Sequence, residues 1–398
     1  MIPSVAALPR SPEMALLLCC ISPLPTPAEV AAVDWPRFQA VVTHHHLLPL
    51  VYRCLKSAAD NGAAVPPEWL AFFKQQAYDI AAFNLRATGI LRRLQRLARE
   101  RGVALIPVKG PALAMWAYAS TSLRQFEDLD LVVRPAELLV AVELLEQEGY
   151  QLRELSPRTD RQRYLRSRQD WSLQRPAEAP HLDLKPVLIS HTLCGPESAD
   201  YLLETSRRID TGDDGDLASP GPEAMLLAVC VDGANESWPK LSAVADVAAL
   251  LANHSNADWT GLVAEAKRLG QWRSLLVGVA LADILLSGPM PSVFAEAIDR
   301  DATAQRLALA AARLLAAGRL PRDEGVQAAR FAWKTRDDWR GRLRLLRRLL
   351  FIPGAADLDW VALPSALYPL YAGLRPCRLA WDAVRRRPRR ICSGAGGA

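Results

Sequence analysis

Two aspartates separated by a single leucine lie in the stretch RQFEDLDLVV, residues 124–133. The largely apolar run predicts a buried strand, in which Asp128 and Asp130 share one face. Two carboxylates this close raise each other's pKa and are costly to bury unless a cation lies between them. A divalent metal ion is the usual cation at such a site. An isolated pair is also common on the solvated face of a half-exposed strand, so the rest of the chain has to supply further evidence.

The sequence contains two further features of this kind. Asp183 lies in HLDLK, residues 181–185, where leucines alternate with polar residues, so its carboxylate also faces the polar side of a predicted strand. Gly110 ends the β-rich run VALIPVKG and precedes a helix-like segment. Such a turn exposes backbone N–H groups at a helix N-terminus, which favours binding of phosphate. Three carboxylates suit a hard divalent ion with oxygen ligands, such as Mg²⁺.

Alternating strands and helices are predicted around these residues, between residues 103 and 220. Strands are expected at 103–110, 126–133, 171–176 and 181–188, helices at 111–119 and 135–150, and a hairpin at 207–220. Residues 1–102 and 221–390 instead show the apolar spacing of helices, and residues 391–398 should be a disordered tail. The predicted fold class is therefore α/β, in the α+β sense, with a small core flanked by N-terminal and C-terminal helical regions.

Composition and charge exclude several classes of protein. Of the 398 residues, 50% are hydrophobic and 23% are charged, as in soluble globular chains of two or three domains. The net charge of +5 is too small to imply nucleic-acid binding, and no apolar stretch reaches the roughly 18 residues of a membrane span. Seven scattered cysteines form no C-x-x-C pair, which indicates reduced thiols. We therefore expect a cytoplasmic protein without a membrane span, and the sequence does not specify its oligomeric state.

Several motifs together resemble the nucleotidyltransferases of the DNA polymerase β superfamily, in particular the branch usually called the uncharacterised nucleotidyltransferase family. The most specific element is the ordered set of Lys-Gly, Arg, Asp-x-Asp and a distant third acid. The segments that carry the resemblance are PVKGPALAMWAY, LRQFEDLDLVV, EGYQL, HLDLK and DGANESWPKLSAVADVAALL. The resemblance extends roughly over residues 11–381 and implies a small mixed-sheet nucleotidyltransferase core.

This resemblance implies a metal-dependent transfer of a nucleotidyl group from a nucleoside triphosphate, with ATP expected, to an acceptor hydroxyl or phosphate, releasing pyrophosphate. Asp128 and Asp130 would hold two Mg²⁺ or Mn²⁺ ions about 4 Å apart. Asp183 would bind the acceptor-side ion and help to deprotonate the acceptor. The acceptor stays open, because a sugar precursor, a small antibiotic-like molecule and a ribosomally made peptide are all compatible with the residues.

The resemblance also implies contacts to the nucleotide. Gly110 would allow the backbone to approach the β- and γ-phosphates, and Lys109 or Arg124 would neutralise the charge that develops on pyrophosphate. Either basic side chain could instead be a solvated surface charge. In the C-terminal helical region, Lys240 could reach a phosphate and Trp238 could stack on the base, although a tryptophan more often belongs to the core.

Three positions depart from the pattern of the superfamily. Pro111 follows Gly110, so one backbone N–H is missing from the phosphate turn. Lys185 and Asp232 stand where the branch often has histidine. These replacements leave the three acids intact but change the expected acceptor or phosphate contacts, and Lys185 is itself a candidate substrate contact.

Two other classes of function stay open. The altered turn is compatible with a catalytically weak relative that binds nucleotide as a regulator. The long helical regions are compatible with an interaction scaffold whose α/β unit is merely structural. Metal-dependent nucleotide binding separates the enzyme and the regulator from the scaffold. Release of pyrophosphate separates the enzyme from the regulator.

Three smaller expectations concern charged residues. The triple histidine at 44–46 is not expected to share a metal ion, because three consecutive residues point in three directions on a helix, and ordinary packing is expected instead. Without a metal the acids should repel one another, so Asp130→Asn should leave the fold intact or even stabilise it. The basic segment 385–390 is expected to keep the tail soluble.

Overall fold

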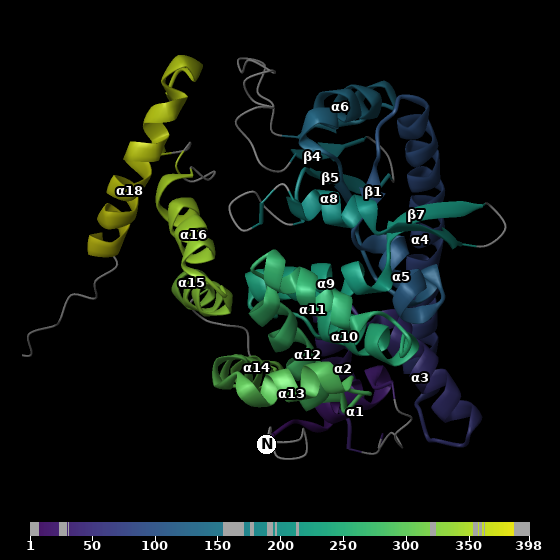
Figure 1. Ribbon diagram of the computed structural model, residues 1–398. Coiled ribbons are helices and arrows are strands. Elements are labelled where there is room, and N and C mark those ends of the chain that lie inside the picture. Colours follow the sequence, from purple (N-terminus) through teal and green to yellow (C-terminus); the bar gives the residue numbers. More distant parts are fainter. Residues whose placement is uncertain are drawn as a thin grey trace, which may run out of the picture.

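The computed structural model describes residues 8–385, except 24–29, 31, 154–170, 176–178, 189–193, 196, 212–214, 319–323, 353–356, 358–359 and 362. Strands occur only between residues 106 and 220 of this part of the chain, with helices before and after them (Figure 1). This arrangement confirms the predicted fold class. The predicted disordered tail at 391–398 and residues 386–390 of the basic segment lie outside the described residues.

A five-stranded mixed sheet forms the centre of the α/β part. Its order is β1-β2-β5-β4-β3. The pair β2–β5 is parallel and the other neighbouring pairs are antiparallel. The strands are β1 (Ile106–Pro107), β2 (Asp128–Val132), β3 (Gln151–Leu152), β4 (Trp171–Gln174) and β5 (His181–Lys185). All the leucines of β2 and β5 are fully buried. The predicted alternation with less buried polar residues is present in β5, whereas in β2 Asp130 and Val132 are buried as well.

The other elements of the α/β part agree only partly with those predicted from the sequence. The predicted hairpin is present as β6 (Ser206–Asp210) and β7 (Asp216–Pro220). Of its predicted turn, residues 213–215, only Gly215 is among the described residues. The first predicted strand contracts to the two residues of β1. Strand β3 and helix α8 (Glu197–Glu204) were not predicted. The remaining elements are α5 (Gly110–Tyr118), α6 (Leu138–Gln147) and the 3₁₀ helices η2 (Thr121–Leu123) and η3 (Pro135–Glu137).

The N-terminal region is helical, as predicted. It contains α1 (Pro12–Ile21), α2 (Trp35–His44), α3 (Leu48–Asp60) and α4 (Pro67–Glu100). Helix α4 begins at Pro67, where a missing N–H costs the helix nothing, and ends just before Gly102, whose φ is +69°. Figure 1 shows α4 as a long helix beside the sheet, and it contacts α5, α6 and β7.

The C-terminal region is also helical. Its helices are α9 (Pro222–Glu236), α10 (Leu241–Asn253), α11 (Trp259–Arg268), α12 (Trp272–Leu286), α13 (Ser292–Arg300), α14 (Ala302–Ala316), α15 (Glu324–Thr335), α16 (Trp339–Phe351), η4 (Ser365–Leu370) and α18 (Tyr371–Arg385). Helix α12 packs against α9, α10 and α14, whereas α15, α16 and α18 lie to one side in Figure 1. Helix α10 packs on α5, which brings the C-terminal region against the turn at Gly110.

Two expectations from composition can be compared with the described residues. None of the helices described is both long and apolar enough to cross a membrane. The six cysteines within the described ranges are all free thiols, as predicted, and Cys392 lies beyond them.

Candidate active site

The parallel pairing of β2 and β5 places the three predicted acids on one face of the sheet. In this register Asp128 lies opposite His181, and Asp130 lies opposite Asp183. Residues directly opposite each other share a face, and so do residues two apart along a strand. The side chains of Asp128, Asp130 and Asp183 therefore point to the same side of the sheet.

Asp130 is bound by two lysines. Lys185 Nζ lies 2.5 Å from Asp130 Oδ1, and Lys109 Nζ lies 3.7 Å from Asp130 Oδ2. Burial alone would raise the pKa of Asp130, but the ammonium groups of Lys109 and Lys185 outweigh this effect and lower the pKa to about 2. The carboxylate is therefore ionised at neutral pH and its charge is already compensated.

Asp128 differs from Asp130 in this respect. It is exposed at the mouth of the cleft, yet partial loss of water and repulsion from Asp130 and Asp183 raise its pKa. Among the described residues, no lysine or arginine forms an ion pair with Asp128 or Asp183. The acidic face thus has one compensated carboxylate and two that lack a cation.

The predicted turn follows β1 and ends in Gly110 at the start of α5. Gly110 has a φ of +53°, and a Cβ at this position would lie 3.3 Å from Leu129 Cδ2 of β2. Both the backbone conformation and the close approach to β2 therefore require glycine. Pro111 is in the first turn of α5, where a backbone N–H has no acceptor within the helix. The helix tolerates Pro111, although the turn offers one N–H donor fewer.

Neither Lys109 nor Arg124 is a solvated surface charge. Lys109 forms a second ion pair with Asp232 of α9, and Asp232 and Asp130 together raise the pKa of Lys109 against the effect of burial. Arg124 Nε donates to Asp246 Oδ2 of α10 at 3.0 Å, and the Arg124 side chain is 14% exposed. Both cations therefore connect the α/β part to the C-terminal helices.

A cleft of about 260 Å³ joins these groups. Lys109, Gly110 and Arg124 line it from the α/β part, together with Asp128 and Asp130. Across the described lining, six carboxylates face three lysine or arginine side chains: Glu127, Asp128, Asp130, Asp232, Glu236 and Asp246 against Lys109, Arg124 and Lys240. The excess of carboxylates should repel a triphosphate, and added cations would reduce this repulsion.

Lys240 also lines the cleft, next to His46, which was not assigned to the site. Lys240 Nζ lies 3.0 Å from His46 Nε2, and His46 lines the same cleft. Burial and the nearby Lys240 lower the pKa of His46, so its neutral ring can accept a hydrogen bond from the ammonium group. The middle histidine, His45, is buried as expected and accepts a hydrogen bond from Leu241 N.

The carboxylates on α9 were also not assigned to the site. Asp232 and Glu236 are one helical turn apart, and both line the cleft. Burial and the proximity of Asp232 raise the pKa of Glu236. Their spacing of four residues was visible in the sequence, but it does not indicate which surface the pair faces.

Trp238 does not line the cleft. It is 1% exposed and has a φ of +57°. A Cβ on Gly233 or Gly278 would lie within 2.9 Å of its indole, so these two glycines make room for the ring. The indole has no exposed face on which a base could stack, and Trp238 belongs to the core instead.

The fit of a divalent ion depends on the carboxylates. In the described residues no three His, Cys, Asp or Glu side chains are close enough together to form a metal site, and Asp183 does not line the cleft. The donor chemistry nevertheless suits Mg²⁺, because Asp128 and Asp130 present carboxylate oxygens in a cleft with excess negative charge. These two residues are the ones that fit such an ion.

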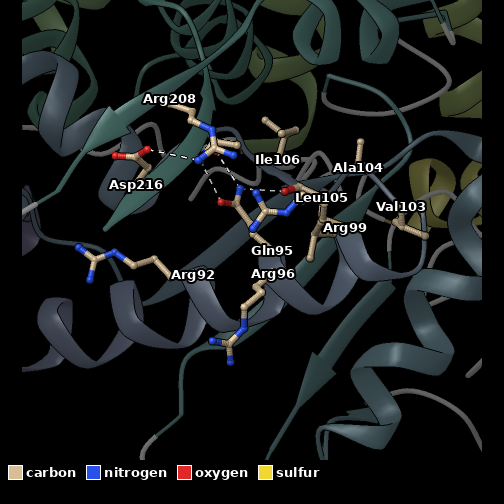
Figure 2. A pocket seen from close by; sticks show the side chains of 12 residues that line it. Arg92, Gln95, Arg96, Arg99, Val103, Ala104, Leu105, Ile106, Arg208 and Asp216 are labelled. Atoms are coloured by element: carbon tan, nitrogen blue, oxygen red, sulfur yellow. Dashed lines mark hydrogen bonds and ion pairs between the residues drawn. The ribbon is translucent and has the colours of Figure 1, made fainter. Parts of the chain in front are cut away.

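A second cavity lies at the other end of β1 and has a different character (Figure 2). It has a volume of about 480 Å³ and is lined by Arg92, Arg96, Arg99 and Arg208. Of the carboxylates described, only Asp216 lines it, and Asp216 pairs with Arg208 at 3.3 Å. This cavity contains none of the predicted site residues and lacks the paired acids that a divalent ion needs.

A glycine turn before a helix N-terminus, with carboxylates on the adjacent strand, is typical of proteins that transfer phosphate-containing groups. Residues 31–287 match the family described as uncharacterised nucleotidyltransferase, and the chain belongs to that family. The match ends directly after α12, so the resemblance expected for residues 11–30 and 288–381 lies outside it. No curated protein matches the chain.

Proposed function

We propose that this protein transfers a nucleotidyl group from a nucleoside triphosphate, with ATP the first candidate, to an acceptor in a reaction that requires Mg²⁺ or Mn²⁺. One observation supports this most directly. The acidic pair Asp128 and Asp130 and the turn at Gly110 line a single cleft in a chain of a nucleotidyltransferase family.

The residues of the cleft have distinct roles in this proposal. Gly110 lets the backbone approach the triphosphate, and Lys109 and Lys240 bind its charged oxygens. Asp128 and Asp130 would hold the divalent ion, which neutralises the triphosphate and polarises the reacting phosphate. An acceptor oxygen forms a bond to the α-phosphorus while the bond to the β-phosphate breaks. Pyrophosphate leaves with the electron pair, and Lys109 stabilises its charge.

A second candidate is a regulator that binds nucleotide without turning it over. Pro111 removes one N–H donor from the turn, which favours this alternative. Both candidates require binding of nucleotide together with metal, and only the enzyme releases pyrophosphate.

Thermal denaturation with each of the four nucleoside triphosphates, with and without Mg²⁺, tests nucleotide binding. At a hundredfold or greater excess over Kd, the right nucleotide with metal should raise stability by about 2–4 kcal/mol. Asp128→Asn should abolish the metal-dependent part of this shift. If no nucleotide gives a metal-dependent shift, both candidates fail and the scaffold remains. Pyrophosphate release in the presence of cell extract then separates the enzyme from the regulator.

A further inference from the structure

Lys185 reaches the acidic face from the strand that carries Asp183. It lies two residues after Asp183 on β5, so both side chains are on the same face. Its ammonium group contacts Asp130 Oδ1 at 2.5 Å, and the Lys185 side chain is only 18% exposed. A cation attached to the chain thus lies among the acids.

The second oxygen of Asp130 is also near an ammonium group. Lys109 Nζ lies 3.7 Å from Oδ2 and is itself held by Asp232 of α9. Lys109 is therefore shared between two carboxylates, whereas the shorter contact of Lys185 is to Asp130. Lys185 is the cation on the Asp183 side of the pair, because it extends from the same strand as Asp183.

Two-metal sites hold their ions about 3.5–4 Å apart, with a carboxylate shared between them. An ion shared by Asp130 and Asp183 would have to lie close to the ammonium of Lys185, where like charges repel and Asp130 Oδ1 is already engaged. Asp128, in contrast, has no cation partner among the described residues. Repulsion by Lys185 therefore disfavours the ion position between Asp130 and Asp183. The position at Asp128 and Asp130 stays open.

We propose that Lys185 takes the place of the acceptor-side metal ion, so that the chain binds one divalent ion with each nucleotide. This inference rests on the proposed function. It also specifies the acceptor. An ammonium group attracts an anion but does not act as a Lewis acid that lowers the pKa of a hydroxyl, as a metal ion does. We therefore infer an acceptor that is already an oxyanion at neutral pH, either a phosphate monoester or a carboxylate, which does not need Asp183 as a base.

The reaction balances without a proton transfer. The acceptor oxyanion attacks the α-phosphorus, a new P–O bond forms, the bond to the β-phosphate breaks, and pyrophosphate carries away the electron pair. The product is a phosphoanhydride from a phosphate acceptor or an acyl phosphate from a carboxylate acceptor. A hydroxyl acceptor would instead yield a phosphodiester.

Counting bound Mn²⁺ by electron paramagnetic resonance tests whether the chain binds one divalent ion with each nucleotide. The protein is saturated with the α,β-methylene analogue of the nucleotide that gives the largest thermal shift. We expect one Mn²⁺ per chain in the wild type and in Lys185→Arg, and two in Lys185→Met. Lys56→Met is the matched control, because the exposed Lys56 side chain pairs with the exposed Asp60 on α3 and its loss should leave the count at one.

Two Mn²⁺ per chain in the wild type would overturn the inference that Lys185 replaces a metal ion. A single Mn²⁺ per chain in Lys185→Met would overturn it too. Either result would leave the proposed function standing. Should Lys185→Met fail to fold, the wild-type count still decides. A wild type that binds neither nucleotide nor Mn²⁺ would refute the proposed function itself.

The linkage in the labelled product from cell extract tests the acceptor. Lability to hydroxylamine indicates a carboxylate, a phosphoanhydride indicates a phosphate, and a phosphodiester would contradict an oxyanion acceptor.

Discussion

Arg124 and Asp246 form a buried ion pair, with Arg124 Nε 3.0 Å from Asp246 Oδ2, across the boundary between the α/β part and helix α10. Asp246 is 1% exposed and also accepts a hydrogen bond from Tyr118 at 2.9 Å. One carboxylate therefore connects the segment before β2, the end of α5 and α10. This contact therefore helps to hold α10 against the α/β part beside the cleft.

Asp246→Asn should lower the free energy of unfolding by about 3 kcal/mol, because it leaves the guanidinium of Arg124 buried without a counter-ion. Asp216→Asn is the matched control. Asp216 pairs with Arg208, both side chains are exposed, and the loss of this pair should cost between about 0 and 1 kcal/mol. Urea denaturation measures both, and equal losses would mean that the buried pair contributes no more than a surface pair.

The two acids of β2 should respond in opposite directions to neutralisation. The pKa of Asp130 is lowered to about 2, so its negative charge stabilises the fold above about pH 4 and this contribution disappears as the pH falls through 2. Asp130→Asn should therefore cost about 2 kcal/mol at pH 7. From the sequence, Asp130→Asn was expected to leave the fold intact or even to stabilise it. The contacts of Lys109 and Lys185 to Asp130 argue against that stabilisation, because they compensate the charge.

Asp128→Asn should not destabilise the protein. The pKa of Asp128 is raised, so its charge is unfavourable in the folded state, and the residue is exposed. Its unfolding free energy should lie within about 0.5 kcal/mol of the wild type or above it. Chemical denaturation of both variants without metal measures the difference, and a larger loss for Asp128→Asn than for Asp130→Asn would contradict the charge distribution described.

Gly110→Ala should destabilise the fold and abolish nucleotide binding. The added Cβ combines a φ of +53° with a contact of 3.3 Å to Leu129 Cδ2, and together these should cost about 2 kcal/mol. Gly62→Ala separates the two effects, because Gly62 has a φ of +87° with nothing within 4 Å of its Cβ, and about 1 kcal/mol is expected there. Only Gly110→Ala should lose the nucleotide-dependent thermal shift.

His45 should make the fold sensitive to mild acid. Burial, with the neighbouring His44, His46 and Lys240, lowers the pKa of His45 to about 3. Between pH 6.5 and 3 the unfolded chain therefore binds a proton that the folded chain does not, and stability falls as the pH decreases. The loss between pH 7 and pH 5 should be about 2 kcal/mol.

His45→Asn tests this assignment. Its side-chain oxygen can still accept the hydrogen bond from Leu241 N, but it cannot be protonated. Urea titrations at pH 7, 6 and 5 should show a flatter profile for His45→Asn, while His44→Asn, at an exposed position, keeps the wild-type slope. An unchanged slope in His45→Asn would assign the acid sensitivity to another group.

Local chemistry made the elements around the site predictable. Pro67 and Gly102 mark the limits of α4 because a proline suits the first turn of a helix and a glycine adopts positive φ after its end. The leucines of β2 and β5, which alternate with polar residues, are buried as this pattern predicts, although Asp130 is buried as well. Sequence patterns therefore located the acidic strands and the turn at Gly110.

The partners of these residues could not be predicted, because they come from distant segments. Lys109 and Asp232 are 123 residues apart in the chain, and Arg124 and Asp246 are 122 apart. No periodicity in the sequence relates such positions, so the ion pairs across the cleft appear only once the helices are packed. The same holds for Trp238, whose burial depends on small residues in two different helices, Gly233 and Gly278.

The transfer reaction itself is tested by incubating the protein with cell extract, Mg²⁺ and each nucleoside triphosphate labelled in the α-phosphate. Asp128→Asn is the appropriate inactive variant, because the charge it removes is one that the fold does not need. We expect a labelled product with the wild type, and a loss of at least a hundredfold with Asp128→Asn at equal folded concentration. Lys56→Met should match the wild type. Equal labelling by the wild type and Asp128→Asn would show that the acidic pair does not carry out catalysis.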